Sequence, residues 1–152
     1  MSIDARLAEL GHELPQAAAP VAAYVPVVQV GQLLHLSGQL PFRDGQLMAG
    51  RCGEDRDEEY GRIAAERCAL MLLAQLKAAL GSLDRVERIV KLGVFVNSAP
   101  TFTAQPKVAN GASELMVAVF GEAGKHARSA VGVPVLPLGA VVEADAVVAI
   151  RG

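Results

Sequence analysis

The stretch "ARSAVGVPVLPLGAVVEADAVVAI", residues 127–150, consists almost entirely of small and β-branched apolar residues and predicts two strands. In its second half the even positions from 140 to 150 are all apolar, so one face of that strand is expected to lie against helices. The same stretch keeps three charged residues, Arg128, Glu143 and Asp145. Charged side chains within so apolar a segment need a structural or a chemical reason.

The rest of the chain alternates strand and helix patterns. Periodic apolar residues, N-cap candidates such as Ser2, and glycines at expected helix ends mark the boundaries. Asp44-Gly45 is a turn signal within a polar loop and predicts a short third strand there. The predicted elements are a short helix within residues 2–14, a β-hairpin over 24–40, a long amphipathic helix over 57–81, a strand over 88–97 and a second helix within 100–121.

This order predicts an α+β fold with a mixed sheet of about six strands and two main helices packed on one face. We expect residues 1–19 to form a helical extension and linker, and residues 20–152 to form the main domain. The second face of the predicted sheet is also largely apolar. Soluble monomers rarely leave a large apolar patch in water, so the pattern predicts self-association.

Composition narrows the classes of function. The formal charge of −2 and the absence of a basic cluster argue against nucleic-acid binding. No apolar run approaches the roughly 20 residues that span a bilayer, and the first residues lack a signal-peptide pattern, so we expect no membrane association and a cytoplasmic location. Cys52 and Cys68 lack metal-site spacing and the histidines are scattered, so no metal or cofactor is expected. Cys68 is predicted to lie in the core.

Three motifs resemble the YjgF/RidA family, also called the L-PSP or translation-inhibitor family. They are "SGQLP" at 37–41, "VKLGVFVN" at 90–97 and "ARSAVGVPVLPLGAVVEADAVVA" at 127–149, and the likeness extends from about residue 20 to 151. The resemblance implies a chorismate-mutase-like fold and a homotrimer with ligand clefts between subunits. It also implies hydrolysis of reactive enamines and imines, such as 2-aminoacrylate, to a 2-keto acid and ammonia.

The resemblance also implies roles for individual residues. Two have catalytic roles, Arg128 as the carboxylate-binding arginine and Glu143 as the water-positioning glutamate. At Ala130 the family frequently has a cysteine, and alanine suffices if only the backbone N–H faces the ligand. The implied substrate-binding residues are Tyr24, Ser37, Gly38, Asn110 and Ala130. The leading helix and a longer segment around "QPKVANGAS" depart from compact family members, and the second departure bears on the alignment of Asn110.

The chemistry of a 2-imino acid fits this pair of charged residues. Its carboxylate suits the planar, two-pronged guanidinium of Arg128. Its electrophilic carbon needs an oriented water, and Glu143 is a candidate to accept the proton of that water, especially if partial burial raises its pKa. Such a reaction needs neither a metal nor a covalent nucleophile.

Structural interpretations compete with each of these roles. Arg128 and Glu143 alone suggest an ion pair, and Asp145 a solvated or interface charge. The remaining alternatives are Tyr24 as a core or interface aromatic, Asn110 as a helix N-cap, Ser37-Gly38 as an ordinary strand end and His126 as a loop histidine. At the level of function, the alternatives are a trimeric protein that binds a carboxylate metabolite without turnover and, less favoured by the acidic balance, an endoribonuclease.

Overall fold

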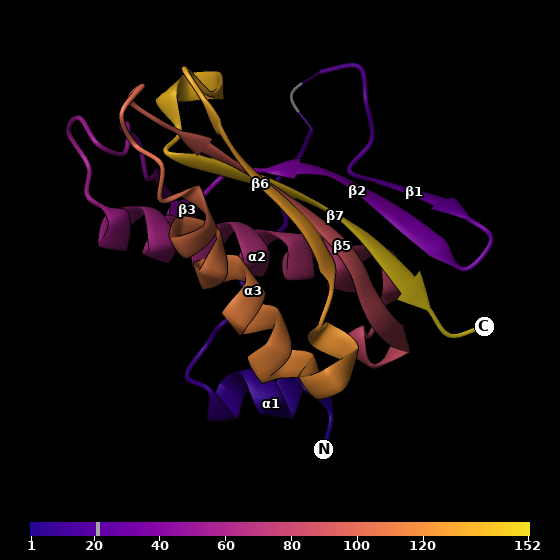
Figure 1. Cartoon of the computed structure of the whole chain (residues 1–152). Helices are drawn as coiled ribbons and strands as arrows, with labels where there is room; N and C mark the ends of the chain where they lie inside the picture. The colour runs from indigo at the N-terminus through magenta and orange to yellow at the C-terminus, as the bar shows by residue number, and fades with distance from the viewer. Residues whose placement is uncertain (21) are drawn as a thin grey trace.

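A five-stranded mixed sheet forms the centre of the computed structural model, which describes residues 1–20 and 22–152 (Figure 1). The strand order is β1-β2-β7-β5-β6, and the β5/β6 pair is parallel whereas the other three pairs are antiparallel. A parallel pair needs a long crossover, and α3 supplies it. The strands are β1 (Val27–Val30), β2 (Leu33–Gln39), β5 (Val86–Asn97), β6 (Ala127–Val133) and β7 (Val142–Ile150).

The predicted hairpin is confirmed as β1 and β2, which turn at Gly31-Gln32 with a positive φ at Gly31. The main sheet has five strands rather than about six, because the short strands on either side of Asp44-Gly45 pair only with each other. Asp44 and Gly45 both have positive φ, as a tight hairpin turn requires. These two strands are β3 (Phe42–Arg43) and β4 (Gln46–Leu47).

Each predicted helix is present. Ser2 caps the first helix by accepting a hydrogen bond from the Ala5 N–H, and Asp57 caps the long helix by accepting from the Tyr60 N–H at 2.8 Å. The long helix ends at Gly81, whose φ of 81° suits a C-cap. The α-helices are α1 (Ile3–Glu9), α2 (Glu58–Leu80) and α3 (Gln105–Phe120), and the short 3₁₀ turns are Leu83–Arg85, Gly121–Gly124 and Pro137–Gly139.

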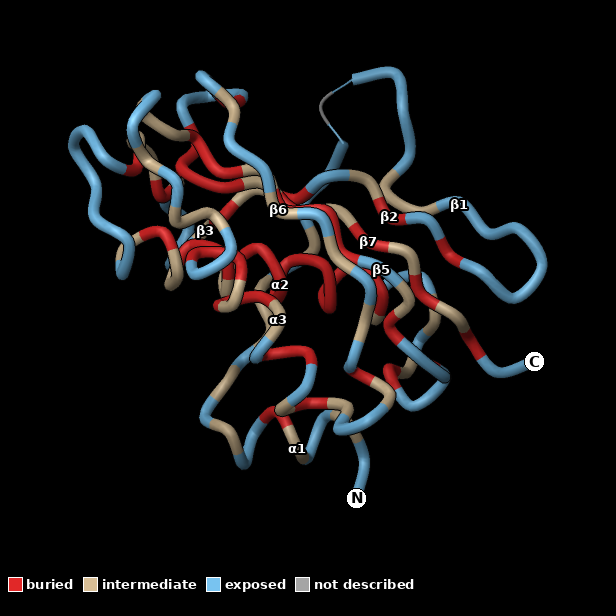
Figure 2. Tube along the Cα trace, viewed as in Figure 1, coloured by how far each residue is buried: buried red, intermediate tan, exposed pale blue. Residues whose placement is uncertain are grey.

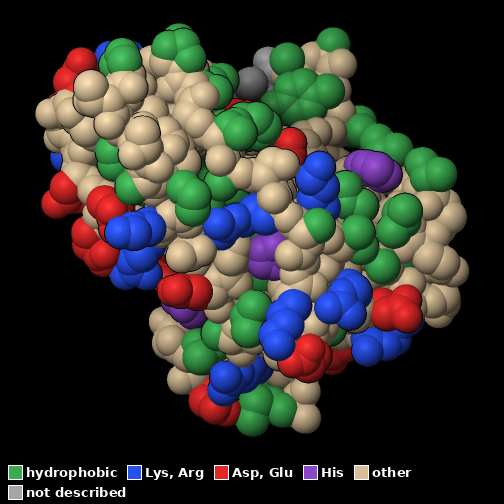
Figure 3. Space-filling model, in the orientation of Figure 1, with side chains coloured by type: hydrophobic (Ala, Val, Ile, Leu, Met, Phe, Trp, Pro, Cys, Tyr) green, Lys and Arg blue, Asp and Glu red, His purple; other side chains and the backbone are tan. Residues whose placement is uncertain are grey.

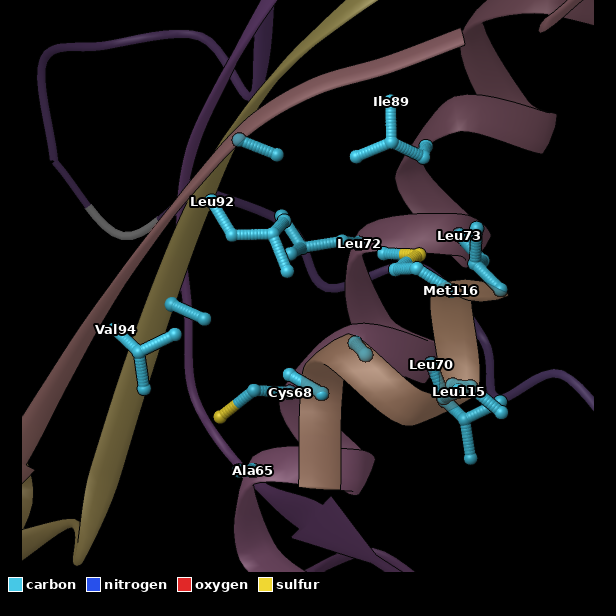
Figure 4. Packing of buried hydrophobic residues seen from close by; sticks show 14 of the residues in the cluster. Ala65, Cys68, Leu70, Leu72, Leu73, Ile89, Leu92, Val94, Leu115 and Met116 are labelled. Carbon is cyan, nitrogen blue, oxygen red and sulfur yellow. The ribbon is translucent and has the colours of Figure 1, made fainter. Parts of the chain in front are cut away.

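Helices α2 and α3 cover one face of the sheet and enclose the core (Figures 1 and 4). Strand β7 alternates between buried even residues and half-buried odd residues, which confirms the predicted faces. Figure 2 shows the resulting buried layer along α2 and the central strands. Cys68 is fully buried in this layer, as predicted. On the opposite face Val28, Val30, Leu33 and Val131 remain exposed in the single chain, so this face has the apolar character expected of an interface.

Helix α1 packs on the same unit, against α3. Its Leu7 is buried in the common core, and the Arg6 side chain donates a hydrogen bond from Nε to the Ala118 carbonyl at 2.9 Å. Lys77 of α2 forms an ion pair with Asp4 at 2.8 Å. Over the described part of the chain, none of the helices has the length and apolar character needed to cross a membrane.

Helices α2 and α3 cross closely at Gly111, and this crossing gives a first prediction. A Cβ atom at Gly111 would collide with the Arg62 backbone carbonyl. In a helix interior, alanine is normally more stabilising than glycine by about 1 kcal/mol. Here the collision makes the substitution destabilising instead. We expect Gly111→Ala to lower the free energy of unfolding by about 3 kcal/mol, measured by urea denaturation.

Glu114→Ala, an exposed change one turn further along α3, is the matched control and should shift the unfolding free energy by less than about 0.5 kcal/mol. A Gly111→Ala protein as stable as the parent would show that the helices are not in contact there.

Candidate functional site

Arg128 lies on the edge strand β6 and faces α3, on the helix-covered side of the sheet. Its Nη1 donates to the Asn110 Oδ1 at 2.9 Å and to the Ser113 Oγ at 3.1 Å. Asn110 lies inside α3 and not at its start, so its interpretation as an N-cap is wrong: the helix begins at Gln105, with Pro106 in its first turn. The side chain of Asn110 instead serves as an acceptor for Arg128.

One edge of the Arg128 guanidinium is left for a ligand. The two hydrogen bonds from Nη1 use both of its protons, while Nη2 makes only a long contact of 3.4 Å with the Pro106 carbonyl. Among the described residues, no carboxylate lies within ion-pair distance of Arg128, and Nε has no acceptor. The Nε/Nη2 edge therefore has the two parallel donors that a carboxylate prefers.

The backbone beside Arg128 adds a further donor. The Ser98 N–H donates to the Val133 carbonyl at 2.9 Å, so the odd residues of β6 direct their backbone groups toward β5. Backbone groups alternate along a strand, so Arg128 and Ala130 direct theirs toward the unpaired edge of the sheet. The N–H of Ala130 is thus directed to the same free edge as the backbone groups of Arg128.

Glu143 lies on the other face of the sheet. Its partner on β5 is Phe95, and its carboxylate lies over Gly38, where an added Cβ would be 2.9 Å from Oε2. Glycine leaves room for this carboxylate, whereas a Cβ atom at position 38 would force the Glu143 side chain to shift. Burial raises the pKa of the half-buried Glu143, and the nearby charge of Asp145 raises it further. A carboxylate of raised pKa is a suitable proton acceptor near neutral pH.

Ser37 and Tyr24 lie near the same end of β2. The pairing of β2 with β7 is irregular between Leu36 and Gln39, and this irregularity contains the Ser37-Gly38 pair. Ser37 Oγ donates to the Val25 carbonyl at 2.7 Å, which ties the segment before β1 to β2. Tyr24 is exposed, so it is not a core aromatic of the single chain.

The structure therefore separates the predicted residues into two groups. The arginine group (Arg128, Asn110 and the Ala130 N–H) lies at the β6 edge, and the glutamate group (Glu143, Gly38, Ser37 and Tyr24) lies on or beside the open face. In the sheet register Arg128 aligns with Leu92, whereas Glu143 aligns with Phe95. The two residues are thus two strands and three residues apart, about 10 Å in each direction, on opposite faces. The ion pair between them is excluded within one chain.

Two residues of this region were not recognised from the sequence as functional candidates. Ser113 accepts the second Nη1 hydrogen bond of Arg128, and His126 Nε2 lies 2.8 Å from the same Ser113 Oγ. His126 lies in the loop between the Gly121–Gly124 turn and β6, as predicted, and its ring is engaged at both nitrogens. The helical spacing of Asn110 and Ser113 is the sequence signal that places both on one face of α3.

The remaining titratable groups suggest no further chemistry at the site. Asp145 is half-buried over Gly93, and burial raises its pKa while the Gly93 backbone N–H and Lys91 lower it. Burial raises the pKa of the Cys52 thiol to about 11, so this thiol stays protonated. Within residues 1–20 and 22–152, no group of three His, Cys, Asp or Glu side chains is arranged to hold a metal ion.

Charges of both signs alternate on the face that carries α3 and β6. Figure 3 shows basic side chains interspersed with acidic ones there, without a continuous basic strip. This distribution does not favour binding along a phosphate backbone.

Comparison with known proteins gives matches over most of the chain. A family model described as "YjgF/chorismate mutase-like, putative endoribonuclease" matches residues 4–147. Protein TCP17 of Trypanosoma cruzi is 55% identical over 148 residues, which are 96% of this chain and 92% of that protein. The crystal structure of Atu1372 from Agrobacterium tumefaciens has a TM-score of 0.92 at 49% identity, covering 98% of this chain and 92% of that one. RidA from an Antarctic Psychrobacter has a TM-score of 0.63 at 31% identity, covering 89% and 94%.

Proposed function

Because the chain belongs to the YjgF/RidA family, we propose that it hydrolyses reactive enamines and imines of the 2-aminoacrylate type to 2-keto acids and ammonia. The observation that carries this proposal is the Nε/Nη2 edge of Arg128, which makes only the 3.4 Å contact of Nη2 with the Pro106 carbonyl. Among the described residues, no carboxylate lies within ion-pair distance of Arg128. A small carboxylate ligand would supply the acceptors for the donors on this edge of the guanidinium.

We place the active site between subunits of a homotrimer. The arginine group and the glutamate group lie on opposite faces of one sheet, and a three-carbon acid is too small to bridge them within one chain. The exposed apolar residues of the open face favour association through that face. Arg128 of one subunit and Glu143 of the next would then face one ligand.

The proposed reaction begins with the protonated imine (iminium) form of the substrate, which 2-aminoacrylate reaches when its C3 takes up a proton and its C=C double bond shifts to C=N. Arg128 and the Ala130 N–H hold the carboxylate. Water attacks C2, its proton passes to Glu143, and the C=N double bond becomes a single bond in a carbinolamine. The proton returns to the nitrogen, the C–N bond breaks, and ammonia leaves while the hydroxyl loses its proton to form the ketone. For 2-iminopropionate and water, the products are pyruvate and ammonia.

An assay that generates 2-iminopropionate with an amino-acid oxidase, and traps the residual imine, tests the proposal. We expect purified protein at catalytic concentration to shorten the lifetime of the imine. Binding of pyruvate without any acceleration would identify a binding protein instead. An RNA-cleaving activity that co-purifies with the protein, and that the Arg128→Ala protein retains, would favour an endoribonuclease with its site elsewhere.

Subunit mixing tests the shared site directly. Arg128→Ala and Glu143→Gln proteins should each be nearly inactive, because each lacks one half of every site. After unfolding and refolding together in equal amounts, about a quarter of the interfaces combine an intact arginine with an intact glutamate. The mixture is therefore expected to recover about a quarter of the parent activity, provided that subunits assemble randomly.

The same two proteins, refolded separately and then combined, are the control and should stay inactive. Failure of the co-refolded trimer to gain activity, or a stable monomer at micromolar concentration in sedimentation, would contradict a site shared between subunits.

A further inference from the structure

Arg128 is the end of a hydrogen-bonded chain that begins at the backbone of a 3₁₀ turn. The Gly124 carbonyl lies 2.6 Å from His126 Nδ1, and His126 Nε2 lies 2.8 Å from Ser113 Oγ. Ser113 Oγ in turn lies 3.1 Å from Arg128 Nη1. The chain connects the turn after α3, the first residues of β6 and the middle of α3.

Chemistry at the two ends determines the direction of the two outer hydrogen bonds in this chain. A guanidinium only donates, so Ser113 Oγ accepts from Arg128. A carbonyl only accepts, so His126 Nδ1 carries the proton that it donates to Gly124. With one proton on the ring, at Nδ1, the remaining hydrogen bond runs from the Ser113 hydroxyl to His126 Nε2. Each donor has one acceptor, and the ring and the hydroxyl are held in one orientation.

These hydrogen bonds also fix the orientation of the opposite edge of the guanidinium, which carries Nε and Nη2. With Asn110 and Ser113 holding both protons of Nη1, the plane of the group is determined, and its Nε/Nη2 edge is left with only the 3.4 Å contact of Nη2 with the Pro106 carbonyl. An arginine without such partners would lose side-chain freedom when it binds a ligand, whereas here that freedom is already lost. The function of the chain is then to prepare Arg128 for a planar anion.

We propose that Ser113 and His126 are positioning residues that hold Arg128 ready for the side-on binding of a substrate carboxylate. The inference rests on the proposed function in that Arg128 receives the carboxylate. It adds that part of the affinity for the substrate comes from residues that never touch it. Because these residues act on the carboxylate end, they affect binding more than the attack of water at C2.

The principal test is Ser113→Ala. We expect KM for the imine and the dissociation constant for pyruvate, measured by titration calorimetry, both to rise about tenfold, while kcat stays within about twofold. Ser113→Thr keeps the hydroxyl and is expected to restore both constants to within about threefold of the parent. Ser82→Ala, which removes a serine hydrogen bond remote from Arg128, is the matched control and should leave both constants unchanged.

A second variant covers the case in which Ser113→Ala fails to fold. His126→Phe keeps a ring but removes both nitrogens, so it leaves the Ser113 hydroxyl free to rotate. His126→Phe is expected to raise the pyruvate dissociation constant, as Ser113→Ala does. Its thermal unfolding midpoint should stay close to that of the parent.

Pyruvate binding separates this inference from the proposed reaction. A parent protein that binds pyruvate but hydrolyses no imine, and loses affinity with Ser113→Ala, would disprove the reaction and retain the positioning role. A parent that hydrolyses the imine, with Ser113→Ala and His126→Phe both keeping its KM and pyruvate affinity, would disprove the positioning role alone. A parent that neither hydrolyses the imine nor binds pyruvate would overturn both.

Discussion

Arg128→Lys is expected to lower kcat/KM for imine hydrolysis by roughly 30- to 1000-fold, a loss of about 2 to 4 kcal/mol in transition-state stabilisation. Lysine keeps the charge but presents a single ammonium in place of a planar fork. It also cannot occupy Asn110 and Ser113 and still present two parallel donors to a ligand. The measurement is the oxidase-coupled imine assay at saturating and subsaturating substrate.

Arg43→Lys on the exposed hairpin strand β3 is the matched control, and its kcat/KM should remain within about twofold of the parent. Both proteins are expected to fold, because the Arg128 side chain is only half-buried. If Arg128→Lys changes kcat/KM by less than about twofold, or ~0.5 kcal/mol, Arg128 is a structural residue and the deaminase proposal fails.

Glu143→Gln is expected to reduce kcat by about 100-fold or more, while KM and the pyruvate dissociation constant stay within about threefold. The amide has nearly the same shape over Gly38 but cannot take a proton from water. Single-turnover and steady-state rates would show this separation of chemistry from binding. Equal losses in kcat and in pyruvate affinity would mean that Glu143 holds the ligand and does not act as the base.

The pH dependence follows from the raised pKa of Glu143. The base must be deprotonated, so activity is present above this pKa and falls as the pH drops through it. Asp145 contributes to the rise through its charge, so Asp145→Asn should shift the acid limb of the kcat profile to lower pH. Its kcat at pH 8 should match that of the parent. An acid limb that stays in place would show that another group controls it.

Local patterns were sufficient for the helices, the strands and most of their boundaries. The cap at Asp57, the end at Gly81 and the alternation of β7 depend on residues a few positions apart, and such interactions are present in the sequence itself. The charges of Arg128 and Glu143 were also evident, because charged residues are rare in segments this apolar. The resemblance to a family then assigned each of them a role.

Tertiary structure decided which of these residues can act together. Strand register places Arg128 on the helix-covered face and Glu143 on the open face, and register depends on pairing with β5, which is distant in the sequence. The same long-range packing turned Asn110 from a candidate helix cap into a partner of Arg128, and brought Ser113 and His126 to it. A single sequence specifies each side chain, but its neighbours across a sheet or a helix crossing exist only once the chain has folded.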